Sequence, residues 1–125
     1  MNLLLDTHIL LWWLNDSPDL KPKTRKAISN TRNQIWISSG SIWEIRTKES
    51  LGKLIVPANF CELLWQQGFQ DLPISASHVN ALRQLPPIHK DPFDRIQIAQ
   101  AIVEKFTIVS ADSLFKDYPV SLIVN

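Results

Sequence analysis

Short apolar runs alternate with longer amphipathic stretches along the whole chain. The apolar runs have the length and side chains typical of β-strands, and we expect strands at Asn2–Leu5, Gln34–Ile37, Asp71–Ile74, Thr107–Val109 and Val120–Val124. The stretches between them have helical periodicity, and we expect helices at Thr7–Leu14, Lys23–Asn30, Ser41–Lys48, Ala58–Gln67, Ala76–Leu85 and Pro92–Lys105. This alternation predicts βαβ units, and therefore an α/β fold with a short parallel sheet of about five strands flanked by helices.

The stretch Pro92–Lys105 carries the clearest helix signals. Its start is marked by Asp91, a good N-cap residue, followed by Pro92 in the first helical position. The helical period predicts one apolar stripe, made of Phe93, Ile96, Ala99, Ile102 and Val103. Gln97 is then expected to face away from the core.

Composition limits the class of protein. A length of 125 residues suits one domain, which we expect to span 1–125. The net charge of +1 provides no strongly basic field, so nucleic-acid binding would depend on local Lys and Arg residues or on a metal ion. Cys61 is the only cysteine, and the first residues lack the features of a signal peptide. We therefore expect a cytoplasmic protein that does not associate with a membrane.

Two expected strands end in an aspartate that immediately precedes a helix. Asp6 follows the first strand, and Asp112 follows the strand at Thr107–Val109. In a parallel sheet both carboxyl groups emerge at the carboxyl edge, where open α/β folds bind their ligands. Helix capping explains each aspartate equally well, because Asp is among the best N-cap residues.

Two further acids have the same ambiguity. Glu44 follows Ser41 at the spacing of a capping box. Asp94 lies in the first turn of the last expected helix, where the helix dipole favours a negative charge. We assign the capping role there to Asp91 and leave Asp94 free for chemistry.

Several carboxylates can share one place when a divalent cation offsets their repulsion. Oxygen ligands suit Mg²⁺ or Mn²⁺, and the sequence has no Cys or His cluster with the spacing of a zinc site. A bound cation of this kind activates water and neutralises phosphate charge, so phosphodiester hydrolysis is the natural reaction.

Four motifs carry a family resemblance. They are LLLDTHILLWWL, SSGSIWEIRTKESLGKL, HKDPFDRIQIAQA and TIVSADSLFKDY, and they cover nearly the whole chain. With these motifs the sequence resembles the PIN-domain ribonucleases, and among them the VapC toxins of bacterial toxin–antitoxin pairs. The resemblance implies an Mg²⁺- or Mn²⁺-dependent endoribonuclease that hydrolyses RNA, a VapB-type antitoxin partner and a homodimer.

The resemblance also implies roles for individual residues. It implies four catalytic acids in one pocket, namely Asp6, Glu44, Asp94 and Asp112. The acids implied as metal ligands are Asp6, Asp94 and Asp112. Thr7 and Ser110 would support the pocket with their hydroxyl groups.

Basic, imidazole and indole groups offer further candidates. Our candidate phosphate contacts are Lys48, Lys53, Lys90 and Arg95, because they flank the acidic motifs. Arg95 could instead pair with a carboxylate. For His8 and His89 an ordinary structural role is commoner than catalysis. The basic run from Lys21 to Arg32 is explained as well by a solvated helix face, and of the five Trp residues we expect one or two at interfaces.

Other functions fit the motifs less well. Haloacid-dehalogenase-like phosphatases need a second Asp where this chain has His8, and receiver domains need an acidic pair and a Lys that are absent here. Two alternatives within the fold stay open. One is an RNA-processing PIN nuclease without an antitoxin, and the other is a catalytically silent module that binds RNA or protein.

Overall fold

The sheet is built from five parallel strands in the order β3-β2-β1-β4-β5, in a computed structural model that describes residues 1–125. The strands are β1 (Asn2–Leu5), β2 (Gln34–Ser38), β3 (Gln70–Leu72), β4 (Thr107–Ser110) and β5 (Ser121–Val124). All neighbouring strands pair in parallel. The α/β class and the five-stranded parallel sheet expected from the sequence are therefore confirmed.

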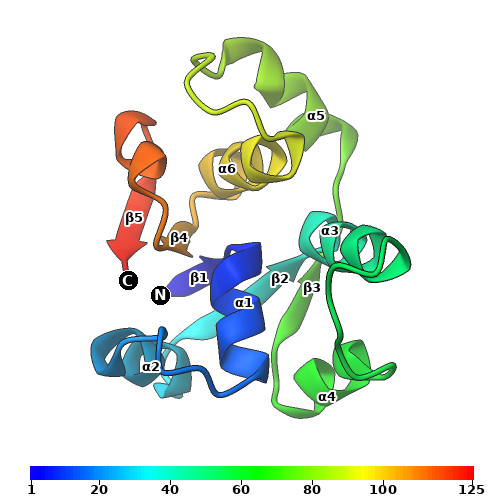
Figure 1. Cartoon of the computed structure of the whole chain (residues 1–125). Coiled ribbons are helices and arrows are strands. Elements are labelled where there is room, and N and C mark those ends of the chain that lie inside the picture. Colours follow the sequence, from blue (N-terminus) through cyan, green and yellow to red (C-terminus); the bar gives the residue numbers. More distant parts are fainter.

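Helices cover both faces of this sheet. They are α1 (Thr7–Leu14), α2 (Pro22–Ser29), α3 (Ser39–Ser50), α4 (Phe60–Gln66), α5 (Ala76–Ala81) and α6 (Pro92–Glu104), with short 3₁₀ helices η1 (Leu82–Gln84) and η2 (Ser113–Asp117). Figure 1 shows α1, α2 and α4 on one side of the sheet and α5 and α6 on the other. None of the helices has the length and apolar character needed to cross a membrane.

The central strand β1 separates two apolar clusters. Leu3 and Leu5 pack into the cluster beneath α1, α2 and α4, whereas Leu4 packs into the cluster beneath α6. This alternation follows from the two-residue period of a strand, which directs successive side chains to opposite faces. Because β1 is buried on both faces, its end is held firmly at the centre of the sheet.

Several boundaries differ from the expected ones. The strand expected at Asp71–Ile74 ends at Leu72, since Pro73 has no N–H to donate to a neighbouring strand, and the Ile74 N–H donates to the Ser39 hydroxyl instead. The helix expected to begin at Ser41 begins at Ser39. The expected helix at 76–85 continues from Leu82 as η1.

The expected orientation of α6 was wrong in part. Gln97 is fully buried and does not face away from the core, and Gln100 is buried beside the sheet as well. Val103, which we had placed on the buried stripe, is 38% exposed. The amides are tolerated inside because they hydrogen-bond to neighbouring groups, a pattern that hydrophobic periodicity alone does not reveal.

The first turn of α3 lies unusually close to α6. A Cβ atom added to Gly40 would lie 3.2 Å from Ile96 Cγ2 and 3.1 Å from Ser38 Oγ. Since real Cβ contacts are rarely this short, Gly40 permits a helix approach that a larger residue would disturb. This approach brings Glu44 and Asp94, one on each helix, toward the same edge of the sheet.

Candidate functional site

Four acidic residues gather at the carboxyl edge of β1, the central strand of the sheet, and of its neighbour β4. The chain builds outward from β1 to β3 and then returns to add β4 and β5 on the other side. The strand order therefore reverses between β1 and β4, and open α/β sheets bind ligands at such a switch point. Asp6 follows β1 and Asp112 follows β4, while Asp94 lies nearby in the first turn of α6.

Asp6 is both a helix cap and a member of this cluster. Its Oδ1 accepts the Ile9 N–H at 2.9 Å, which caps α1. Its Oδ2 accepts a short hydrogen bond from the Ser110 hydroxyl. The Ser110 oxygen in turn accepts the Asp112 N–H at 3.0 Å, so this one hydroxyl links the two strand ends.

Asp112 uses its two oxygens in the same way. Oδ1 accepts the Leu114 N–H at 2.9 Å and caps η2, while Oδ2 lies 2.7 Å from His89 Nε2. The same His89 nitrogen lies 3.1 Å from Oδ2 of Asp94. The imidazole thus bridges two acids that come from different elements.

The hydrogen bonds of His89 indicate its tautomer. Nδ1 accepts the Asp91 N–H at 3.2 Å, so in the neutral ring the proton is on Nε2, which faces the two carboxyl groups. The His89 N–H donates to the Tyr118 hydroxyl at 2.7 Å, and the ring packs edge-on against Phe115. We had favoured an ordinary loop role for His89, and the structure instead places it inside the acidic cluster.

The structure shows whether Asp91 and Glu44 cap the helices α6 and α3, as the sequence suggested. Asp91 Oδ1 accepts the N–H groups of Phe93 and Asp94, as expected for the N-cap of α6. Glu44 does not belong to a capping box, because α3 is capped by Ser38 and Glu44 lies inside the helix. Its Oε2 pairs with Lys48 Nζ at 2.8 Å.

A buried polar network supports the cluster from behind. The Thr7 hydroxyl donates to Ser41 Oγ at 3.1 Å and accepts from Gln97 Nε2 at 3.2 Å. These contacts join α1, α3 and α6, the helices that carry or adjoin the acids. Thr7 therefore holds the walls of the site together and makes no direct contact with a carboxylate.

The surroundings push the carboxyl pKa values apart. Burial, followed by the charge of Asp91, raises the pKa of Asp94 from 3.8 to about 7. Burial also raises the pKa of Asp6, against the hydrogen bonds from Ser110 and Ile9. Burial alone would raise the pKa of Asp112, but the Leu114 N–H and His89 outweigh it and lower that pKa. Near neutral pH the cluster therefore contains carboxyl groups of unlike protonation.

The donor atoms of the site fit a divalent cation. His89, Asp94 and Asp112 each offer a ligand atom, and these atoms lie within 4.8 Å of one another. Glu44 Oε1 and Gln97 Oε1 are buried and have no hydrogen-bond partner. Orphaned buried oxygens beside mutually repelling carboxyl groups are the arrangement that a cation such as Mg²⁺ stabilises.

The residues expected to contact phosphate differ in their surroundings. Lys48 pairs with Glu44, and Lys90 is exposed beside Asp91. Arg95 donates through Nη1 to the carbonyls of Pro86 and His89, so the structure supports neither the expected phosphate contact nor the carboxylate pair. Arg95 instead fixes the loop that carries His89.

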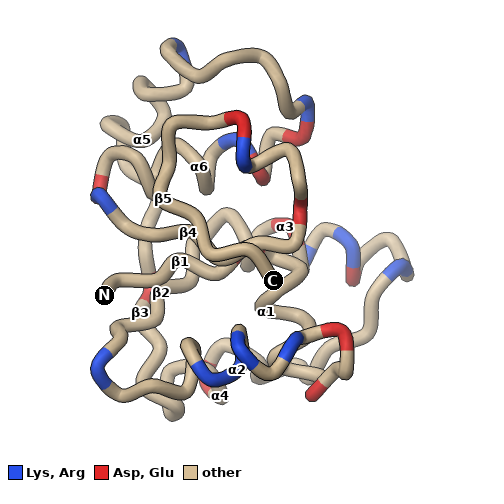
Figure 2. The backbone as a smooth tube through the Cα atoms, turned by 90° about the vertical axis from the view of Figure 1, so that its left-hand side faces the viewer, with Lys and Arg blue, Asp and Glu red and all other residues tan.

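The basic run of the sequence lies elsewhere. Figure 2 shows its Lys and Arg positions gathered along α2, which packs near the lower edge of the molecule. Arg25 pairs there with Asp16 at 3.0 Å. This arrangement agrees with a solvated helix face.

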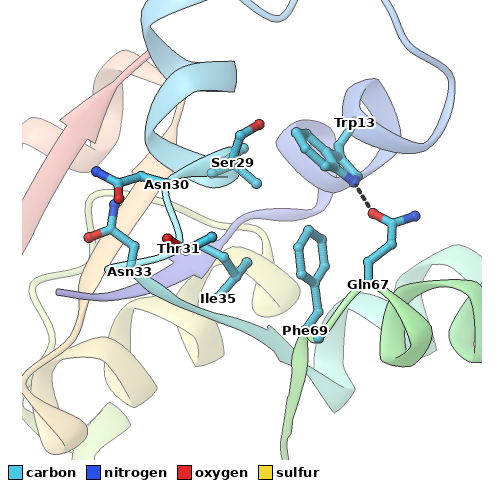
Figure 3. A pocket seen from close by; sticks show the side chains of 10 residues that line it. Trp13, Ser29, Asn30, Thr31, Asn33, Ile35, Gln67 and Phe69 are labelled. Atoms are coloured by element: carbon cyan, nitrogen blue, oxygen red, sulfur yellow. Dashed lines mark hydrogen bonds between the residues drawn. The ribbon is translucent and has the colours of Figure 1, made fainter.

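The largest cavity is not part of the acidic site. It has a volume of about 500 Å³ and is lined by Trp13, Asn30, Ile35, Gln67 and Phe69 among others (Figure 3). Trp13 Nε1 donates to Gln67 Oε1 at its rim at 2.8 Å. No acidic or basic residue lines this cavity, so it contains none of the four acids of the cluster.

Comparison with protein families identifies the fold. The model of the PIN domain matches residues 3–120. The chain belongs to the PIN-domain family. The match spans all four acids, and the single PIN domain has the α/β architecture with parallel strands described above. No curated protein matched the sequence.

Solved structures show the same PIN fold at low sequence identity. One is the structure of VapBC2 from Rickettsia felis bound to a DNA fragment from the VapBC2 promoter. It matches with a TM-score of 0.76 and 21% sequence identity, and the match covers 100% of this chain and 99% of that chain. DNA-bound VapBC from Salmonella typhimurium gives 0.71 at 16% identity, over 99% and 98% of the two chains. FitAcB from Neisseria gonorrhoeae gives 0.69 at 17% identity, over 98% and 96%.

Sequence reasoning undervalued two residues of this PIN domain. His89 precedes the cap Asp91 by two residues, and its Nδ1 bonds to the backbone of that cap, which is a local contact that the spacing permits. Gln97 stands three residues after Asp94, on the same helix face. This spacing from a candidate catalytic acid could have indicated that Gln97 lies beside the acidic cluster.

Proposed function

We propose that this PIN domain, spanning 1–125, is a metal-dependent endoribonuclease that hydrolyses phosphodiester bonds in RNA. The observation that carries the proposal is the convergence of Asp6, Asp94 and Asp112 at the switch point of the sheet, with Glu44 nearby on α3. Ionisation of such a cluster is unfavourable, because burial and, after it, neighbouring negative charges raise the pKa of Asp94. A bound divalent cation would offset this cost, and the cation could then bind the phosphate group of a substrate.

Asp6, Asp94 and Asp112 would hold an Mg²⁺ or Mn²⁺ ion through their carboxyl oxygens, with Glu44 Oε1 available to it or to its water. When bound, such an ion polarises water for attack on phosphorus and neutralises charge on the phosphate oxygens. Water adds to phosphorus and one P–O bond breaks, which leaves a phosphate monoester on one fragment and a hydroxyl on the other.

The protein groups around the ion have separate tasks. Ser110 fixes the Asp6 carboxyl group through its hydroxyl, and His89 holds Asp94 and Asp112 in place through Nε2. Thr7 and Gln97 tie together the helices that form the walls. Lys48 and Lys90, which line a groove next to the acids, would contact the phosphates of the substrate.

A nuclease assay with matched variants tests this proposal. Purified protein should cut a fluorescently labelled RNA in Mg²⁺ or Mn²⁺, and EDTA should stop the reaction. Asp6→Asn and Asp94→Asn should each lower the cleavage rate at least about a hundredfold, since each removes a charged ligand. Asp117→Asn, which changes an exposed acid outside the cluster, is the control. Full activity of Asp94→Asn would exclude the proposed site.

We further propose that the chain is the toxin of a VapBC-type pair, with a VapB-type antitoxin as partner, and that it forms a homodimer in the cytoplasm. The similar structures named above are VapBC and FitAcB assemblies, which supports a partner of this kind. Expression of the chain alone should arrest growth of the host, and coexpression with the small reading frame next to its gene should restore growth. Equal growth with and without the neighbour would favour an RNA-processing nuclease. Light scattering would measure the dimer.

A further inference from the structure

The cavity of about 500 Å³ drawn in Figure 3 lies at the opposite edge of the sheet from the acidic cluster. Its lining includes Ile35, near the start of β2, and Phe69, which immediately precedes β3. Trp13 contributes from the last turn of α1 and follows Asp6 by seven residues, which corresponds to about 10 Å along a helix. The cavity is therefore a separate place on the molecule, and the proposed nuclease reaction gives it no role.

The lining of this cavity changes from apolar to polar between its floor and its rim. Ile28, Ile35 and Phe69 are buried and form the apolar floor. The rim consists of exposed residues without charge, namely Ser29, Asn30, Thr31, Gln67 and Gly68. The volume lies within the range of about 300–1,000 Å³ typical of ligand sites. The cavity thus suits an uncharged ligand that has an apolar body and polar edges.

An indole ring held in place by two contacts forms one wall. Trp13 Nε1 donates to Gln67 Oε1 at 2.8 Å, and the guanidinium carbon of Arg25 lies 5.8 Å from the centroid of the indole. The Phe69 ring is tilted by 44° to the indole, with centroids 5.7 Å apart. Figure 3 shows both rings on the same side as Gln67, across from Thr31. Because the indole is restrained before a ligand arrives, a flat ligand loses little entropy in ordering this wall.

Several polar groups of the rim are free to bind a ligand. Gln67 uses only its Oε1 within the protein, and Asn30 uses only its Oδ1, which accepts a backbone N–H at 3.0 Å. The NH₂ groups of both amides and the hydroxyls of Ser29 and Thr31 therefore have no protein partner. Amide NH₂ groups donate, and hydroxyls donate or accept. The ring nitrogens and exocyclic groups along the edge of a nucleobase have the complementary pattern.

We propose that this cavity binds a free purine nucleoside, with the base against Trp13 and the apolar floor and the base edge hydrogen-bonded to the rim. Bases stack on aromatic side chains through their flat faces. The two fused rings of a purine cover more of this wall than the single ring of a pyrimidine does. A nucleic-acid strand is a poor occupant, because no Lys or Arg lines the cavity to neutralise its phosphates. The proposal does not depend on the nuclease function.

Isothermal titration calorimetry of the full chain in EDTA measures nucleoside binding without a divalent ion at the acidic cluster. Adenosine and guanosine should bind with a Kd on the order of 0.1 mM, which is the affinity expected at the usual ligand efficiency of molecules of this size. Uridine should bind more weakly. AMP should bind no more tightly than adenosine, since the lining carries no cation, and a short RNA strand should not displace adenosine.

Two variants test the wall and the rim. Gln67→Glu keeps the acceptor for Trp13 Nε1 but replaces the free NH₂ donor with a carboxylate oxygen, so it should weaken adenosine binding about 10-fold. Gln66→Glu, which adds the same charge to an exposed neighbour outside the cavity, should have no effect. Trp13→Leu should weaken binding about 5- to 100-fold through the loss of stacking. Circular dichroism checks that each variant is folded.

Two further measurements locate the ligand. In a proton–nitrogen NMR spectrum, adenosine should shift the indole N–H signal of Trp13 and leave that of Trp43, which packs on Phe93, unchanged. Asp94→Asn should bind adenosine as wild type does, because Asp94 belongs to the acidic cluster at the other edge of the sheet.

Four results would overturn the proposal. They are the absence of purine binding at about ten times the expected Kd, equal affinity of wild type, Gln67→Glu and Trp13→Leu, loss of binding in Asp94→Asn, and displacement of adenosine by the RNA strand. The last two would transfer the base to the nuclease site. None of the four bears on the nuclease proposal, which rests on the acids.

Discussion

The Asp94→Asn substitution should stabilise the metal-free protein at neutral and alkaline pH. Burial and the charge of Asp91 raise the pKa of Asp94 from 3.8 to about 7 in the folded chain. The folded state therefore holds a proton that the unfolded state has already released, so wild-type stability falls as the pH rises from about 4 to about 7 and then levels off. Asn has the same shape as the protonated acid and does not ionise.

The size of the effect follows from the shift. A rise from 3.8 to about 7 corresponds to at most about 4 kcal/mol at 1.36 kcal/mol per unit. The Asp94 side chain is 17% exposed and part of the shift comes from neighbouring charges that solvent screens, so we expect about 1–2 kcal/mol. For a chain of this length that is about 4–8 °C in Tm.

The assay is a set of thermal melts of wild type and Asp94→Asn at several pH values between 4.5 and 8.5, in EDTA and in excess Mg²⁺. In EDTA the variant should gain little at pH 4.5, progressively more up to about pH 7, and a constant amount above it. In Mg²⁺ the wild type should gain about 2.7 kcal/mol at a concentration of about 100 times Kd, and the variant should gain less. Asp117→Asn should show neither effect.

Two outcomes would refute this reasoning. If Asp94→Asn were less stable than wild type in EDTA at pH 8, the ionised carboxyl group would be favourable in the folded state, through His89, and its pKa would not be raised. If both proteins gained equally from Mg²⁺, Asp94 would not be among the groups that hold the ion.

Substitutions at three further positions test the supporting contacts. Ser110→Ala should destabilise the protein by about 1–3 kcal/mol in a denaturant titration and reduce RNA cleavage, because it leaves a buried Asp6 oxygen without its donor, and Ser110→Thr should restore both. In the same titration at about pH 4.5, where Asp94 is protonated and is not repelled by the charge of Asp91, Asp91→Ala should lower stability by about 1 kcal/mol, whereas Asp91→Asn, which still caps α6, should leave stability nearly unchanged. His89→Ala should lower the cleavage rate more than His89→Gln does, since Gln keeps an N–H donor within reach of the carboxyl groups.

Hydrophobic periodicity was sufficient to predict the sheet of this protein. The runs at Asn2–Leu5 and Thr107–Val109 are almost wholly apolar, as strands buried on both faces must be, and both strands lie at the centre of the observed sheet. The edges were less predictable. Pro73 ended β3 earlier than its apolar neighbours suggested, because a missing N–H matters more at that position than hydropathy.

The polar interior was the part that the sequence did not reveal. Gln97 and Gln100 are buried because each amide has specific partners on other elements, Thr7 for one and the Leu72 carbonyl for the other. Those partners are distant in sequence, so no local period identifies them. The position of His89 between Asp94 and Asp112 depends likewise on a loop conformation fixed by Arg95 and Tyr118.

The sequence left open whether Asp6 and Asp112 cap a helix or take part in chemistry. That alternative assumed that a carboxyl group can have only one of these roles. In each residue Oδ1 caps a helix and Oδ2 faces the cluster. The cap restrains the side-chain rotation, and that restraint fixes where the second oxygen lies before any ligand arrives, which reduces the entropy lost on binding. Because Asn caps a helix about as well as Asp, Asp→Asn at these positions keeps the restraint and replaces the second oxygen with an NH₂ group, which removes both the charge and the acceptor that faces the cluster. The two roles are therefore separable by experiment although they belong to one side chain.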